Sequence, residues 1–173
     1  MPIPRPFAVV AALLAGGMAM AQPVLNPMPA GGTVAFLGIT FLDTSTEGDL
    51  NGVRPDETAR TALLEEEVRA RFAAEGFDLL DTAPVAEDLA RTANPADCYG
   101  CEVRMAQALG ADLVLVGEVQ KVSNLILSMN LVLRDAETGD FVRGQSVDIR
   151  SNTDDSWLRG IRYILRNNIF REG

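Results

Sequence analysis

The residues best suited to chemistry are two cysteines, Cys98 and Cys101, in the run Cys-Tyr-Gly-Cys at the start of an expected helix. In an oxidising compartment this spacing favours a short disulfide, which would stabilise the fold by about 2 kcal/mol. A redox-active pair is the alternative, because the amino terminus of a helix lowers the pKa of a thiol. Metal binding is a third interpretation, but Asp97 and Glu102 complement two thiolates poorly.

The sequence contains no histidine. This excludes Ser-His-Asp and Cys-His catalysis, a histidine general base and nearly all transition-metal sites. We therefore name no catalytic residue, cofactor or metal ligand. Residues 47–52, EGDLNG, resemble the first half of a calcium loop, but Thr58 stands where the bidentate glutamate belongs. A solvated acidic loop is the favoured interpretation of that segment.

Four polar residues, Gln120, Lys121, Ser123 and Asn124, stand between the two most strand-like runs of the chain. They are either ordinary turn residues or a recognition tip, since binding residues favour loops on rigid scaffolds. If the tip binds a partner, substitution of Lys121 and Asn124 should weaken binding and leave thermal stability nearly unchanged.

Arginines recur at helical spacing near the carboxyl terminus. Arg159, Arg162 and Arg166 form a stripe that is either a solvated helix face or a contact for an acidic partner. Trp157, in the same helix, is expected to anchor it in the core.

The amino terminus resembles a secretory signal. Residues 1–21 combine Arg5, an apolar stretch and the small-residue cleavage pattern Ala19-Met20-Ala21. We expect cleavage after Ala21, a periplasmic location, an extended lead-in over residues 22–32 and one domain over residues 33–173. No second long apolar run follows, so the mature chain should have no transmembrane segment.

The net charge of the chain is −9. Loss of residues 1–21, which hold one arginine and no acidic residue, makes it one unit more negative. An acidic surface repels nucleic acid and anionic lipid, so neither is an expected partner.

Hydrophobic periodicity and turn signals predict alternating strands and helices. The expected strands are residues 33–40, 77–81, 112–122, 125–134 and 141–150. Helices are expected at residues 56–75, 101–109 and 154–170, with a weaker helical segment at residues 84–93 and a polar loop at residues 41–55. Right-handed crossovers make the first three strands parallel, and the hairpins add antiparallel partners.

This element order resembles the amino-terminal domain of TolB and the related CsgG-like domains. The matching features are FLDTS at residues 41–45, LGAD at residues 109–112 and the turn at residues 135–139. The resemblance implies an α/β fold of three layers, with a mixed five-stranded sheet of order 2-1-3-4-5, strand 4 antiparallel, and helices on both faces. The chain lacks the β-propeller of TolB, so the contacts of that propeller do not carry over.

A more specific resemblance is to a family of small exported bacterial proteins of unknown function. It rests on VQKVSNLIL at residues 119–127, VDIR at residues 147–150 and NTDDSW at residues 152–157. It implies no established activity.

Three hypotheses for function follow. The first is a non-enzymatic periplasmic adaptor that docks onto another envelope protein through the hairpin tip and an edge strand. The second is a thiol-disulfide protein acting through Cys98 and Cys101. The third is a small-ligand binder at the carboxyl ends of the parallel strands, near residues 41–46 and Thr82. Neither the partner nor the oligomeric state follows from the sequence.

Overall fold

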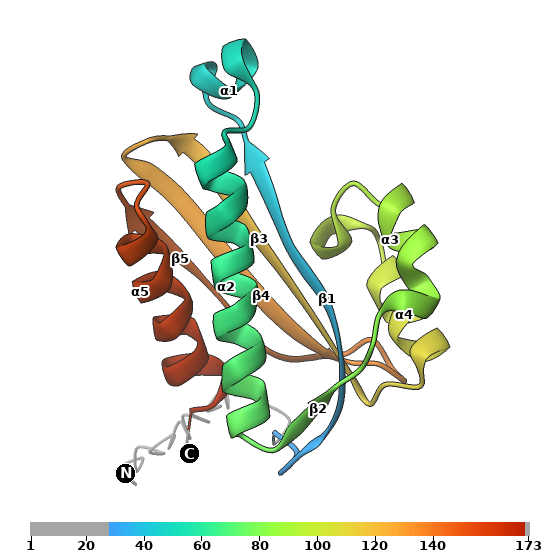
Figure 1. Cartoon of the computed structure of the whole chain (residues 1–173). Helices are drawn as coiled ribbons and strands as arrows, with labels where there is room; N and C mark the ends of the chain where they lie inside the picture. Colours follow the sequence, from blue (N-terminus) through green and yellow to red (C-terminus); the bar gives the residue numbers. More distant parts are fainter. Residues whose placement is uncertain (1–27, 172–173) are drawn as a thin grey trace, which may run out of the picture.

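The protein, seen here as a computed structural model that describes residues 28–171, is built on one five-stranded sheet of order β2-β1-β3-β4-β5 (Figure 1). The strands are β1 (Gly32–Asp43), β2 (Phe77–Leu79), β3 (Leu113–Ser123), β4 (Ile126–Asp135) and β5 (Phe141–Arg150). β1 runs parallel to β2 and β3, whereas β4 is antiparallel to β3 and β5. The predicted strand order and the antiparallel fourth strand are confirmed.

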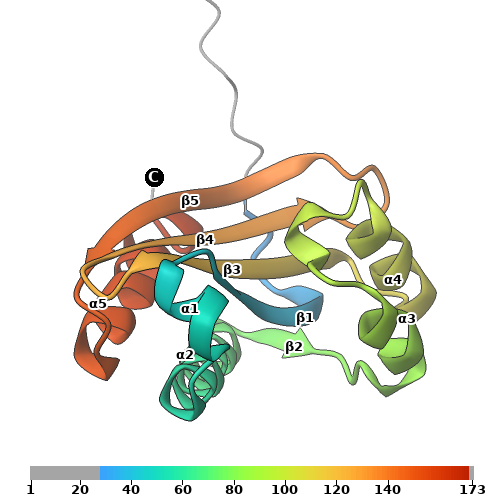
Figure 2. The same ribbon diagram turned by 90° about the horizontal axis from the view of Figure 1, so that it is seen from above.

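Helices cover both faces of this sheet, which gives the three layers that the sequence predicts (Figures 1 and 2). The helices are α1 (Thr46–Asn51), α2 (Pro55–Ala74), α3 (Ala86–Arg91), α4 (Cys101–Leu109) and α5 (Asp154–Ile164), with single turns η1 (Ala83–Val85), η2 (Pro95–Asp97) and η3 (Leu165–Ile169). α2 and α5 pack together on one face, and α4 packs on the other.

The larger core lies between the sheet and the pair α2 and α5. The predicted apolar stripe of α2, formed by Leu64, Val68 and Phe72, is fully buried against β1 and β3. Trp157 is also fully buried, as expected of an anchor for α5. The apolar strand runs therefore supply the burial that drives folding.

The opposite face of the sheet carries a smaller core. Met105 and Ala106 of α4 pack with Val114 and Val116, which alternate with the residues that face the larger core. Both faces of β3 are thus covered, which explains its nearly continuous apolar sequence.

Two segments differ from the sequence prediction. The loop expected at residues 41–55 holds the end of β1 and the short helix α1, which Ser45 caps by accepting a hydrogen bond from the Gly48 amide. The central hairpin also turns later than expected, because β3 continues to Ser123 and β4 begins at Ile126. Residues 47–52, the suspected acidic loop, accordingly form α1 and its carboxyl cap.

The predicted signal peptide, residues 1–21, lies outside the described residues, as does most of the lead-in. Within residues 28–171, no helix is long and apolar enough to cross a membrane. At the carboxyl end, the single helix expected over residues 154–170 is α5 followed by the π-helical turn η3.

Candidate functional site

The sole lysine of the chain, Lys121, is fully buried where the parallel strands β1 and β3 end. Its Nζ atom donates to carboxylate oxygens of Asp43 at 3.0 Å, Glu47 at 3.2 Å and Glu57 at 2.7 Å. The prediction that Lys121 lies in an exposed turn is wrong. Residues two positions apart on a strand point to the same face, and Val119 is buried. The side chain of Lys121 therefore also points into the core.

Local structure brings the three carboxylates to Lys121. Asp43 is the register partner of Lys121 across the parallel ladder of β1 and β3. Glu47 lies in α1, which begins directly after β1. Glu57, also fully buried, stands in the first turn of α2 and accepts a hydrogen bond from the Arg54 amide in a capping arrangement. The cluster therefore ties two strand ends to two helices.

The hydrogen bonds of the cluster favour the charged forms of Asp43, Glu47 and Lys121. Burial raises the pKa of Asp43, but hydrogen bonds from Ser45 and Lys121 outweigh it, so this pKa lies below its ordinary value. Hydrogen bonds from Asn124 and Lys121 lower the pKa of Glu47. Burial lowers the pKa of Lys121, but its hydrogen bonds to Glu57, Asp43 and Glu47 outweigh this effect and raise the pKa above its ordinary value. A lysine nucleophile needs a lowered pKa, so Lys121 holds structure rather than reacting.

Amides extend the cluster to the hairpin turn and to α5. Asn124 in the turn donates to Glu47 at 2.7 Å, and Asn152 donates to Glu57 at 2.7 Å and to Asn124 at 3.3 Å. The indole of Trp157 donates to Asn152 at 3.0 Å. The two stretches that carry the resemblance to exported proteins, residues 119–127 and 152–157, thus meet here. We call these seven residues the Lys121 cluster: Asp43, Glu47, Glu57, Lys121, Asn124, Asn152 and Trp157.

The other predicted tip residues lie around this cluster. Gln120 is in β3 and approaches the hydroxyl of Thr44 at 3.5 Å, and Ser123 ends that strand and accepts from the Leu125 amide. Asn124 is the one of the four predicted residues that lies in the exposed turn itself. Sequence reasoning missed Asp43, Glu57 and Asn152 as partners of Lys121, because their separation along the chain gives no periodic signal.

Above the cluster, aliphatic side chains are exposed at the end of the molecule where α1 and the β3–β4 turn lie beside each other (Figure 2). We call this set the apical patch: Leu50 (78% exposed), Val53 (53%), Val122 (53%), Leu125 (70%) and Ile126 (48%). Among the described residues, these are five of the eight large hydrophobic side chains that are exposed. Isolated exposed side chains are normal, whereas contiguous apolar patches are typical of interaction surfaces, so this set is a candidate for one.

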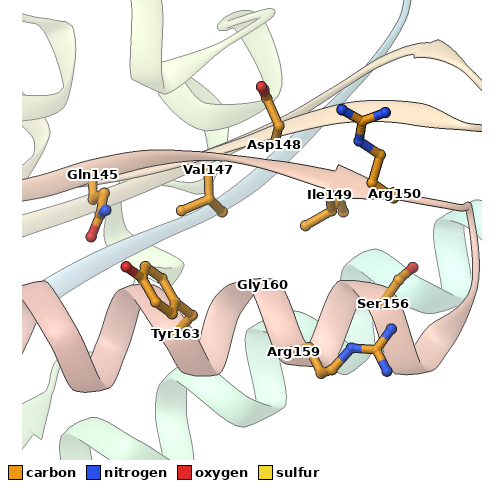
Figure 3. Close-up of a pocket in the computed structure, with 9 residues that line it drawn as sticks. All are labelled: Gln145, Val147, Asp148, Ile149, Arg150, Ser156, Arg159, Gly160 and Tyr163. Carbon is orange, nitrogen blue, oxygen red and sulfur yellow. The ribbon is translucent and has the colours of Figure 1, made fainter.

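A groove of about 490 Å³ runs along the free edge of the sheet between β5 and α5. Gln145, Val147 and Ile149 point from β5 toward the helix, while Asp148 and Arg150 point to the other face (Figure 3). α5 approaches closely at Gly160, where an added Cβ would lie 2.7 Å from a methyl carbon of Ile149. β5 pairs with β4 on one side and with no described strand on the other.

The predicted arginine stripe on α5 is divided between two surfaces. Arg159 lines the β5 groove and pairs with Asp155 at 2.5 Å. Arg162 pairs with Glu67 of α2 at 2.8 Å and, with Arg166, lines a hollow on the α2 side. The three arginines therefore lie on two different surfaces.

Cys98 and Cys101 are joined in a disulfide just before and at the start of α4. The two sulfurs and Glu102 are close enough to suggest a metal site, but both thiols are consumed by the bond. Tyr99, inside the closed loop, is 97% exposed. The structure thus has the pair in the bonded form that the sequence favours.

The third hypothesis placed a small ligand at the carboxyl ends of the parallel strands. In the structure, the side chains of the Lys121 cluster fill the space beside Asp43, and Ser45 is buried beneath α1. This end of the sheet is a packed polar core.

The chain as a whole can now be compared with known proteins. The model of the DUF3280 family, described as "Protein of unknown function (DUF2380)", matches residues 32–169. The chain belongs to this family. The predicted membership in a family of unknown function is confirmed. No curated protein matches the chain.

Solved structures are similar to this DUF3280 protein at low sequence identity. Lipoprotein GNA1162 from Neisseria meningitidis is 16% identical, with a TM-score of 0.51, and the match covers 79% of this chain and 96% of that one. The LpoB C-terminal domain from Salmonella enterica is 18% identical, with a TM-score of 0.48 and coverage of 72% and 86%. TolB from Acinetobacter baumannii is 13% identical, with a TM-score of 0.39 and coverage of 83% and 30%.

Proposed function

We propose that this protein is a non-enzymatic module of the bacterial envelope that docks onto another envelope protein through the apical patch. The observation that carries the proposal is the patch itself: five exposed aliphatic side chains stand on a base fixed by buried ion pairs. A pre-ordered surface loses little conformational entropy on binding, which favours association.

The position of the patch supports this role. It lies at the α1 end of the molecule, opposite the end where β1 begins and β2 lies (Figure 1). A signal peptide, as the sequence predicts, would deliver the protein to the periplasm and leave this end free to project.

The partner surface that fits the patch is apolar with basic residues around it. The chain carries a net charge of −9, and Asp49 on α1 is exposed beside Leu50. Complementary charge would accelerate association and exclude acidic surfaces. An extended segment of the same partner would find a second contact at the free edge of β5, where backbone groups can accept an added strand.

Chemical reasoning supports a non-enzymatic role. Lys121 is held charged by three carboxylates, the two cysteines are bonded to each other, and the chain contains no histidine. The thiol-disulfide alternative remains a separate hypothesis that the reduction potential of Cys98 and Cys101 tests.

Site-specific photocrosslinking tests the docking proposal. A photoreactive residue at Leu50 or Leu125 should capture the same envelope protein, and one at Tyr99, which is 97% exposed in the disulfide loop, should not capture it. The captured protein is then purified, and its affinity for the wild type and for patch variants is measured. Equal affinity for both would reject the patch as the docking surface.

A further inference from the structure

A hollow of about 650 Å³ lies at the end of the molecule opposite the apical patch, where α2 and η3 end. It is lined by three arginines, two aromatic side chains, one amide and one carboxylate: Arg71, Arg166, Arg171, Tyr163, Phe170, Asn167 and Glu75. A neighbouring hollow of about 220 Å³ shares Arg71 and Arg166. Arg71 comes from α2, Arg166 from η3 and Arg171 from the segment after η3, and α2 packs against α5, which η3 continues.

The charge of this region is opposite to that of the whole chain. Both acidic residues are already neutralised, because Glu75 pairs with Arg71 at 2.6 Å and Glu67 pairs with Arg162 at 2.8 Å. Arg166 and Arg171 have no ion-pair partner within residues 28–171 and are exposed. Two uncompensated cations thus share one concave site in a protein with a net charge of −9.

Arg71 is held in place by two contacts, but one of its hydrogen-bond donors has no partner. Its guanidinium carbon lies 5.2 Å from the centre of the Phe170 ring, and its terminal nitrogen pairs with Glu75. Its Nε atom is the only buried polar side-chain atom in the described part of the chain that has no hydrogen-bond partner. Such groups are rare in native proteins, since an unmet buried donor costs about 1–3 kcal/mol.

Helix-dipole compensation is the ordinary explanation for arginines at helix carboxyl ends. It accounts for cations on each helix separately. It does not account for three guanidinium groups and two aromatic rings around one hollow.

We propose that this hollow binds the phosphate group of a soluble phosphate ester. A carboxylate is satisfied by one arginine fork, whereas a phosphate has enough oxygens to accept from several forks at once. The Tyr163 side chain, 47% exposed at the rim, offers one further donor and an apolar face for the organic part of the ester. The acidic net charge disfavours approach to an anionic membrane, so a soluble ester is favoured over a lipid headgroup.

Calorimetry with inorganic pyrophosphate and with phenyl phosphate, on the whole mature chain, tests the proposal. The double variant Arg166→Gln/Arg171→Gln should bind at least about tenfold more weakly than the wild type. The matched control Arg104→Gln/Arg150→Gln removes two exposed arginines that have no ion pair within the described residues, so it should change affinity by less than about twofold. Equal losses in the two variants would indicate non-specific attraction and overturn the proposal.

Vesicles separate the two sources of phosphate. Sedimentation with phosphatidylglycerol vesicles, compared with phosphatidylcholine vesicles, reports binding to an anionic headgroup. Binding of the soluble phosphates without vesicle binding supports the ester. Arginine-dependent binding only to phosphatidylglycerol supports the phosphate site but assigns it to lipid. No binding of either soluble probe or of anionic vesicles at millimolar phosphate would overturn the site.

Discussion

Nζ of Lys121 lies 2.7 Å from Oε1 of Glu57, and neither side chain is exposed to solvent. Ion pairs of this kind need not stabilise a protein more than apolar packing does, but removal of one partner leaves a buried charge uncompensated. Lys121 is therefore expected to have a large effect on folding, and through the position of α1 and the hairpin turn it supports the apical patch.

The first prediction concerns this lysine. Lys121→Met should lower the free energy of unfolding by about 3–5 kcal/mol, because Glu57 would remain buried without its cation. Urea denaturation followed by circular dichroism measures the loss. The double variant Lys121→Met/Glu57→Gln should recover part of it. A change below about 1 kcal/mol in the single variant would show that the cluster contributes little.

The second prediction concerns pH. Asp43 and Glu47 have pKa values below their ordinary values of 3.8 and 4.5 in the folded state. As pH falls through these ordinary values the unfolded chain takes up protons first, so stability must fall with pH. The pKa of Lys121 is raised above its ordinary value of 10.5 in the folded state. Its contribution to stability is therefore fully present below pH 10.5 and is lost as pH rises through the folded-state pKa.

Urea denaturation as a function of pH checks this linkage. The stability difference between the wild type and Lys121→Met should be largest near neutral pH and shrink below about pH 4, where the carboxylates are protonated. A difference that stays constant down to about pH 3 would contradict the proposed electrostatic origin.

The third prediction concerns the disulfide. Replacing both Cys98 and Cys101 by serine should lower stability by about 2 kcal/mol, the amount expected for so short a loop. If the pair is structural, partner binding persists in this variant. A reduction potential well below that of thioredoxin, about −270 mV, fits a structural bond. A higher potential together with loss of function would favour the redox hypothesis instead.

The fourth prediction concerns the contact of α5 with β5. Gly160→Ala places a Cβ 2.7 Å from a methyl carbon of Ile149, so the helix must shift away from the strand. We expect a loss of about 1–3 kcal/mol, which thermal denaturation detects. Ile149→Ala removes the obstructing methyl group. The double variant should therefore be less destabilised than the sum of the two single variants, and strict additivity would contradict the contact.

The sequence predicts correctly those helices and strands whose apolar residues recur at a regular spacing. The stripe of Leu64, Val68 and Phe72 in α2 and the alternation in β4 are confirmed, because burial of one face imposes a period that can be read directly. The helix over residues 101–109 and the strand over residues 141–150 have the predicted bounds.

The Lys121 cluster could be predicted only in part. The alternation of Val119 and Lys121 along β3 places the lysine on the buried face. The polar residues around it in the sequence nevertheless favoured the interpretation of this segment as a turn. Its partners Glu57 and Asn152 come from segments whose proximity depends on the packing of α2 and α5. Such long-range ionic contacts leave no local pattern in one sequence. The helix α1 was missed because it is a single capped segment of six residues.

The affinity of the purified envelope partner for apical-patch variants tests the central claim most directly. Leu50→Ser/Leu125→Ser should retain the thermal stability of the wild type, because both side chains are exposed, and should bind at least about tenfold more weakly. The control Tyr99→Ser removes an exposed aromatic side chain away from the apical patch and from β5, and it should bind with the affinity of the wild type. Unchanged affinity in the patch variant would contradict docking through the apical patch.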